Sequence, residues 1–296
     1  MALEQNKAGD SRPEHGGSKG NSCNRVQIHR MKDVQNTPDT RNIALKEAGI
    51  KNLSYPITIL DREDREQRTV ADIQMSVSLP HHFKGTHMSR FLEVLTASGC
   101  RFTGSTIPTV LNKLKQTLQA ESARIRIEFP YFLTKKAPIS KSEAKMKYNC
   151  VFTGESTART HDFVLTVTVP VSTLCPCSKE ISESGAHNQR GYITMDVRTK
   201  QQPDGSYEMI WIEELVEIAE ASASSPLYTI LKRPDEKFVT EQAYNNPVFV
   251  EDIVRSVAEK LRADNRITQF TVTAENHESI HNHNAYAVVE WERCIT

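Results

Sequence analysis

Two thiols and an imidazole lie close together between Val169 and Gly191, a stretch that reads VPVSTLCPCSKEISESGAHNQRG. Cys175 and Cys177 flank one proline, and His187 follows twelve residues after Cys175. Thiolate and imidazole are good ligands for zinc and similar transition metals. The Cys-Pro-Cys spacing differs from the Cys-x-x-Cys of zinc ribbons and redox pairs, and alternate residues of an extended chain point to opposite sides. We therefore expect only one of the two cysteines to face a metal ion, with further ligands supplied from elsewhere in the chain.

An ordinary buried cysteine is the usual alternative to a metal ligand. The position after a strand-like run, in a polar loop that contains Lys179, favours an accessible and activated thiol instead. On these grounds alone, Cys175 and Cys177 are equally good candidates.

A second cluster, ENHESIHNHNA, occupies residues 275–285 between two expected strands. It contains three histidines and two carboxylates: Glu275, His277, Glu278, His281 and His283. Any one of them suits a polar hairpin loop, but together they indicate a metal or acid–base site.

The elements that must position these clusters follow the same order twice. Apolar spacing predicts two strands, two helices and two strands in the first half, at residues 54–60, 72–79, 88–95, 107–118, 123–131 and 146–155. The second half repeats this order at residues 161–171, 192–198, 209–224, 247–263, 267–275 and 285–292. We interpret this as an internal structural duplication in an α+β protein, with helices covering one face of each antiparallel sheet.

Composition sets the domain boundaries and excludes several classes of protein. Residues 1–48 are rich in Gly, Ser, Asn and charge, which predicts a disordered tail; the two modules then span residues 49–158 and 159–296. Lys plus Arg and Asp plus Glu both number 37, so no general nucleic-acid or membrane surface is expected. The chain has no apolar run of membrane-spanning length and no signal-peptide pattern, and its six cysteines are scattered. These features favour a reducing, cytoplasmic location.

The two clusters also resemble the motifs of a known family. CPCSKEIS, GAHNQRG and ENHESIHNHNA, together with LKRPDEKFVTE at 231–241 and NPVFVEDIVR at 246–255, are similar to type IB GTP cyclohydrolase I. The resemblance covers roughly residues 50–296. It implies a tunnelling fold of two tandem ββααββ modules, whose antiparallel sheets join into a barrel when the chain oligomerises. Such closure removes exposed strand edges.

The resemblance also implies roles for individual residues. The implied metal ligands are Cys175, His187, Glu236 and His281. Cys175 is in addition implied to take part in catalysis, and Glu278 and His281 are implied as the acid–base pair. By composition alone, Glu236 is a solvated charge in a loop between two helices. The roles of Cys177, His277 and His283 stay open.

Glu251 illustrates two competing explanations for one residue. A first-turn acid is sufficiently explained by the helix dipole. The resemblance instead implies a substrate contact, in which the carboxylate accepts the parallel N1–H and 2-amino donors of guanine; Asp252 is the alternative anchor. Four cations are equal candidates for holding the triphosphate: Lys232, Arg233, Lys237 and Arg255.

The implied activity is conversion of GTP and water to 7,8-dihydroneopterin triphosphate and formate, the first step of tetrahydrofolate biosynthesis. A divalent ion (Zn, Mn or Fe) would activate water for attack on guanine C8. The expected assembly is a homo-oligomer, a tetramer, with sites where subunits meet. Two alternatives are a tunnelling-fold nitrile reductase, with a covalent Cys and NADPH, and a non-catalytic metal-binding protein.

Overall fold

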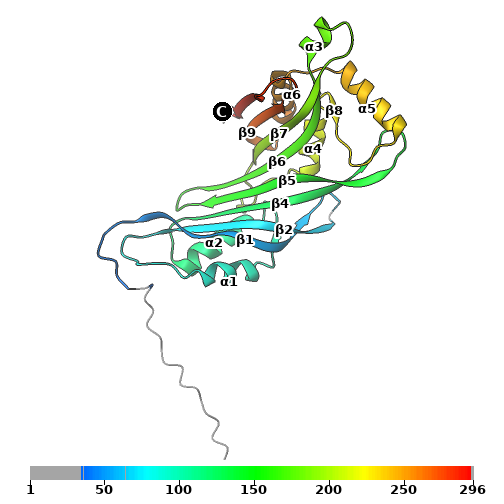
Figure 1. The fold of residues 1–296 in the computed structure, drawn as a ribbon. Coiled ribbons are helices and arrows are strands. Elements are labelled where there is room, and N and C mark those ends of the chain that lie inside the picture. Colours follow the sequence, from blue (N-terminus) through cyan, green and yellow to red (C-terminus); the bar gives the residue numbers. More distant parts are fainter. Residues whose placement is uncertain (1–34, 36, 64, 295–296) are drawn as a thin grey trace, which may run out of the picture. The chain divides into compact units, whose positions relative to one another are not determined.

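The computed structural model describes residue 35 and residues 37–63 and 65–294. Most of the predicted tail therefore lies outside the described residues. The described strands form one ten-stranded sheet in the order β10-β9-β7-β6-β5-β4-β2-β1-β3, with β8 paired to β6 (Figure 1). The strands are β1 (Leu45–Leu60), β2 (Glu66–Leu79), β3 (Arg101–Phe102), β4 (Ala123–Lys136), β5 (Glu143–Ser156), β6 (His161–Leu174), β7 (Asn188–Thr199), β8 (Ser225–Pro226), β9 (Ile267–His277) and β10 (Ala285–Glu292).

The direction of the strands places four hairpin loops at one end of the sheet. Every neighbouring pair of long strands is antiparallel, and only β1 and β3 run parallel. The β1–β2, β4–β5, β6–β7 and β9–β10 connections consequently leave from the same end. Both clusters identified in the sequence, residues 175–187 and 278–284, are among these loops.

Helices cover one face of the sheet, where alternate residues of each strand are buried. In β6, Val167, Val169 and Val171 are fully buried, while the residues between them are partly exposed. The helices packed on this face are α1 (Ser89–Ala97), α2 (Ile107–Leu118), α4 (Ile212–Glu220) and α6 (Val250–Ala263). The alternation of apolar and polar residues in the sequence therefore has a structural cause: one face of the sheet packs against helices and the other face remains polar.

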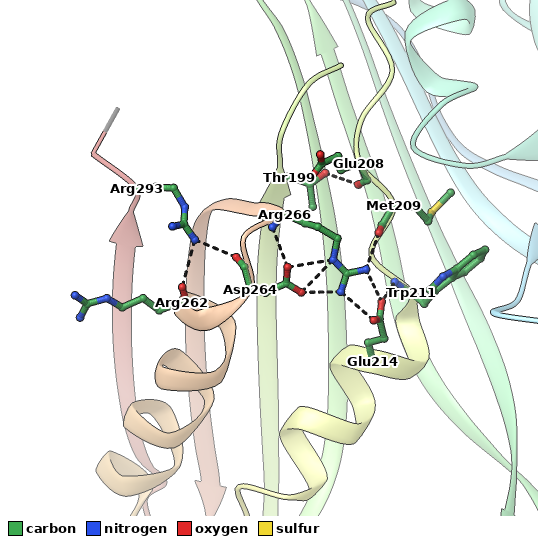
Figure 2. A network of polar contacts seen from close by, with 9 residues as sticks. All are labelled: Thr199, Glu208, Met209, Trp211, Glu214, Arg262, Asp264, Arg266 and Arg293. Carbon is green, nitrogen blue, oxygen red and sulfur yellow. Dashed lines mark hydrogen bonds and ion pairs between the residues drawn. The ribbon is translucent and has the colours of Figure 1, made fainter. Parts of the chain in front are cut away.

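A network of polar contacts connects the start of α4 to the α6–β9 connection, at the ends of β7 and β9 opposite the β6–β7 and β9–β10 loops (Figure 2). The Arg266 guanidinium donates to both carboxylate oxygens of Glu214, at 2.9 and 3.2 Å, and to Asp264 at 2.6 Å. Hydrogen bonds from Arg266 lower the pKa of Asp264. Arg293 donates to the backbone oxygens of Asp264 and Arg262 at 3.0 and 3.2 Å. These contacts hold the second-module elements together away from the predicted site.

The structure corrects the predicted elements in three places. Helix α5 (Arg233–Asn245) was not expected, and it places Glu236 in a first helical turn, so the predicted loop around this residue was wrong. Helix α3 (Pro176–Ile181) follows Cys175 directly. Strand β1 begins at Leu45, so residues 45–48 are strand and not tail. Leu45 pairs with Leu79 while remaining exposed, because backbone pairing at a sheet edge needs no apolar burial.

None of the helices in the described part of the chain has the length and apolar content that crossing a bilayer requires.

Candidate metal and substrate site

Cys175 lies at the point where β6 ends and α3 begins. Its backbone is extended, and its thiol accepts a hydrogen bond from the backbone N–H of Ser178 at 3.4 Å. The Cys175 backbone N–H donates to the His187 carbonyl at 3.2 Å. Cys177 lies in the first turn of α3 and is exposed, whereas Cys175 is half-buried. The helical turn therefore separates the environments of the two thiols.

His187 is held from three directions at the other end of the same loop. Its backbone N–H donates to the Ser178 hydroxyl at 3.2 Å, and that hydroxyl donates to the Cys175 carbonyl at 3.1 Å. The ring Nδ1 lies 3.0 Å from Gln189 Oε1 and 3.4 Å from Ser279 Oγ. The loop thus brings Cys175 and His187 together through their own backbone and one serine.

The β9–β10 loop reaches this site because β7 and β9 are paired, with Arg190 opposite His277. Residues 278–284 therefore leave the sheet beside the start of β7, and the Ser279–His187 contact joins the two loops. Glu278 is half-buried and His281 is exposed. The His281 ring stacks on the His283 ring, with centroids 5.2 Å apart. The predicted hairpin is confirmed, and it carries the acid–base candidates to the same end of the sheet as Cys175.

The start of α6 approaches from the helix-covered side. Its lead-in residue Val248 donates a backbone hydrogen bond to Leu174, the residue before Cys175, at 3.2 Å. Glu251 is exposed in the first turn. Asp252, the alternative anchor, is already used by the fold, because its carboxylate accepts from the Phe249 backbone N–H at 3.1 Å. Of these two acids, Glu251 is the one left to contact a ligand.

Glu236 lies at the other end of α5 from this cluster. The far end of α5 is beside α3, where Lys179 Nζ donates to the Tyr244 carbonyl at 2.5 Å. Glu236 precedes Tyr244 by eight residues, or about 12 Å along the helix axis. Its neighbour Asp235 accepts backbone hydrogen bonds from Ile139 and the residue after it, both at 2.8 Å, which fixes this end of α5 to the β4–β5 loop. Burial opposes the ionisation of Asp235, but these bonds outweigh it and its pKa is lowered.

The described residues of one chain contain no group of three or more His, Cys, Asp or Glu side chains placed to hold a metal. Cys175 and His187 do offer sulfur and nitrogen donors at one site, a combination that suits a divalent transition metal. Two buried polar atoms on the strands that flank β7, Thr173 Oγ1 and Asn276 Oδ1, have no hydrogen-bond partner among the described residues. Buried polar atoms of this kind are normally satisfied by a ligand or water. The residues present thus fit a polar, metal-containing site.

Gly191 allows β6, β7 and β9 to pack closely together beside these buried atoms. A Cβ at this position would lie 2.7 Å from Asn276 Oδ1 and 3.1 Å from Thr173 Cγ2. Any side chain here would displace the buried Asn276 amide. The second glycine of GAHNQRG is therefore required by the close approach of three strands.

Sequence reasoning missed Ser178, Gln189 and Ser279. All three are within the quoted motifs, but polar residues in loops rarely stand out by type. Ser279 contacts His187 across 92 positions of sequence, which only the sheet pairing brings together.

Comparison with known proteins identifies related sequences and folds. The sequence model of the family described as "Type I GTP cyclohydrolase folE2" matches residues 31–287. A GTP cyclohydrolase FolE2 from Thermosipho melanesiensis is 54% identical over 260 residues, covering 88% of this chain and 98% of that protein. A GTP cyclohydrolase FolE2 from Geobacter sulfurreducens is 52% identical over 263 residues, covering 89% and 99%.

Solved structures share the fold at low sequence identity. Uricase from Arthrobacter globiformis has a TM-score of 0.50 at 8% identity, covering 84% of this chain and 94% of that one. Urate oxidase from Bacillus sp. TB-90 has a TM-score of 0.51 at 9% identity, covering 84% and 100%. Together with the element order, these neighbours confirm the predicted α+β tunnelling fold, with the sheet open in the single chain.

Proposed function

This chain belongs to the type I GTP cyclohydrolase folE2 family, and from that premise we propose that Cys175, His187 and the β9–β10 loop form its reaction centre. The chain is a GTP cyclohydrolase, and we propose that it releases 7,8-dihydroneopterin triphosphate and formate. One observation carries the placement of the centre: hydrogen bonds through Ser178 and Ser279 gather both predicted clusters at one end of the sheet. The nitrile reductase alternative is not favoured.

We assign the binding of a divalent ion to Cys175, His187, His281 and Glu236. When bound, a Zn, Mn or Fe ion supplies the Lewis acidity that activates water for attack on guanine C8. Since α5 separates Glu236 from Cys175 within one chain, we propose that Glu236 serves a site shared between copies in a homotetramer. The scattered cysteines support a cytoplasmic location for this assembly.

Glu251 is proposed to orient the base. Its exposed carboxylate, three residues after the Val248 N–H that bonds to the Leu174 carbonyl, can accept hydrogen bonds from guanine N1–H and the 2-amino group together. That contact would hold the five-membered ring of the purine, the part that must open, toward Cys175 and His187.

Glu278 and His281 are proposed to move the protons. Opening the five-membered ring cleaves the C8–N9 bond, so a proton must reach N9. Release of formate then cleaves the N7–C8 bond, and a proton must reach N7. A carboxylate and an imidazole in one hairpin loop can each take a proton from water and return it to these nitrogens.

The experiment measures formate and pterin formation from GTP by the full chain, before and after chelation. We expect activity to be lost on chelation and restored by added Zn²⁺, Mn²⁺ or Fe²⁺. Cys175→Ala should abolish turnover without changing the melting temperature, and Cys177→Ala is the matched control that should remain active. Equal loss from both variants, with metal still bound to Cys175→Ala, would refute the assignment of the thiolate. Metal binding without formate release would support the non-catalytic alternative.

A further inference from the structure

We propose that Gln189 is a positioning residue for His187, because its side-chain carbonyl accepts a hydrogen bond from the Nδ1–H of the imidazole and leaves Nε2 free to bind a metal ion. This inference rests on the proposed function of His187 as a ligand. It adds a residue that does not itself contact metal or substrate.

The backbone contacts on both sides hold the Gln189 side chain next to the His187 ring. Gln189 Oε1 lies 3.0 Å from His187 Nδ1, the distance of a normal hydrogen bond. The backbone on either side is fixed: Gln189 pairs with Thr173 in the β6–β7 ladder, and the His187 N–H is bonded to Ser178 Oγ. Ser279 Oγ lies 3.4 Å from the same ring nitrogen, on the opposite loop. Two polar side chains therefore converge on Nδ1 and none of these contacts uses Nε2.

In a neutral imidazole, this contact determines which ring nitrogen carries the proton. A neutral ring carries one N–H, and the other nitrogen has the lone pair that a metal needs. An amide oxygen can only accept, so its contact with Nδ1 selects the tautomer that is protonated at Nδ1. The reverse orientation of the amide would donate to Nδ1 and place the proton on Nε2, which would block metal binding. A hydrogen bond to the non-ligating nitrogen is also what orients the ring of a metal-binding histidine.

Substitutions at Gln189 separate these possibilities. Gln189→Glu provides an oxygen that can only accept, whereas Gln189→Leu fills similar space without any acceptor. Asn188→Ala is the matched control, since Asn188 is the adjacent residue of the same strand, is exposed and points to the opposite face. All three variants are made in the full chain, and melting temperature verifies that each folds.

The first measurement is metal affinity, obtained by competition between the protein and a chelator for Zn²⁺. We expect Gln189→Leu to weaken Zn²⁺ binding by about tenfold to a hundredfold, and Gln189→Glu and Asn188→Ala to bind within a few-fold of the original chain. Unchanged affinity in Gln189→Leu, or equal weakening in Gln189→Glu and Gln189→Leu, overturns the proposal.

The second measurement reads the tautomer directly. Long-range ¹H–¹⁵N spectra of the metal-stripped chain, labelled at the histidine rings and assigned with His187→Ala, should show His187 protonated at Nδ1. Gln189→Leu should shift it toward the Nε2-protonated form, and a packing role alone would not move this signal. An Nε2-protonated His187 in the original chain overturns the proposal. If His187→Ala itself keeps full Zn²⁺ affinity, the ligand assignment fails, which is a different outcome from failure at Gln189.

Discussion

The starts of helices α4 and α6 have the same local sequence pattern but different surroundings. Residues 211–214 read WIEE and residues 249–252 read FVED: an aromatic residue, an aliphatic residue and two acids. In both, the second acid accepts a hydrogen bond from the backbone N–H of the aromatic residue, at 2.8 Å in α4 and 3.1 Å in α6. Both helices therefore begin by the same capping mechanism.

In α4 both acids are used by the fold. Glu213 is 9% exposed, and its Oε1 accepts from the Tyr131 hydroxyl at 2.7 Å and from the Arg62 backbone N–H at 3.1 Å. Burial and this bond to Glu213 raise the pKa of Tyr131. Glu214 is held by Arg266 (Figure 2). These partners come from the first half of the chain and from the residue before β9.

In α6 the corresponding acids are more exposed, although Asp252 still caps the start of the helix. Glu251 is exposed, and Asp252 lies 3.8 Å from Arg255, whose side chain is 75% exposed. The comparison shows that local sequence determines where a helix begins, while tertiary neighbours decide whether its acids serve the fold or remain available to a ligand.

The sharpest test of this difference is Glu251→Gln. If Glu251 holds the base, this change removes a charged acceptor of hydrogen bonds. It also places the NH₂ group of glutamine against a donor of guanine, where no hydrogen bond can form. We expect kcat/KM for GTP to fall by about thirtyfold to a thousandfold, equivalent to roughly 2–4 kcal/mol. Metal content and melting temperature should stay unchanged. Near-normal kinetics with a small loss of stability would leave Glu251 as an ordinary helix-end charge.

Glu213→Ala should act on stability instead of on substrate affinity. It removes an acceptor from the buried Tyr131 hydroxyl and the Arg62 N–H, and we expect a loss of about 2–3 kcal/mol in unfolding free energy. Denaturant unfolding measures it. Glu213→Gln keeps an acceptor oxygen and should lose less. If Glu213→Ala unfolds like the original chain, the first acid of α4 is no more important for the fold than the first acid of α6.

Arg266→Ala tests the network that holds the start of α4. Because the Arg266 side chain is 34% exposed, we expect a loss of only about 1–2 kcal/mol near neutral pH. The lowered pKa of Asp264 means that its contribution is complete above the ordinary carboxyl range and is lost as pH falls through the lowered value. The difference between variant and original chain should therefore shrink as unfolding is measured below about pH 4. A difference that grows in acid would contradict this account.

Much of the fold was visible in the sequence because alternation and helical spacing report burial directly. The apolar positions from Ile107 to Leu118 that predict a helix all lie in α2, and the strand predicted at 285–292 matches β10 residue for residue. Helix α5 was missed because its sequence buries only Asp235 and Ala243, so it shows no apolar stripe. Helix α3 has no buried residue at all.

For the candidate site, sequence motifs located the loops but not their partners. The loops at 175–187 and 278–284 were predicted, and antiparallel pairing brings them together. The placement of Glu236 away from Cys175 follows from the length of α5, which the motif does not reveal. The pairing of Arg266 with Glu214 spans 52 positions and depends wholly on tertiary structure. The catalytic roles themselves stay predictions.

The smallest expected effect concerns Asp252, the counterpart of Glu214. Asp252→Asn keeps an oxygen for the Phe249 N–H but removes the charge that favours a helix start. The nearest cation, Arg255, is 3.8 Å away and exposed, so its contribution is small. The change should lower the unfolding free energy by about 0.3–1 kcal/mol, measured as a small shift in melting temperature. Glu214→Gln, the same change in α4, should cost more, since it also weakens the contact with Arg266. GTP kinetics should be unaffected by Asp252→Asn if Glu251 is the anchor. A kinetic defect in Asp252→Asn equal to that of Glu251→Gln would instead show that Asp252 takes part in the proposed guanine contact, so that a capping acid also serves the ligand.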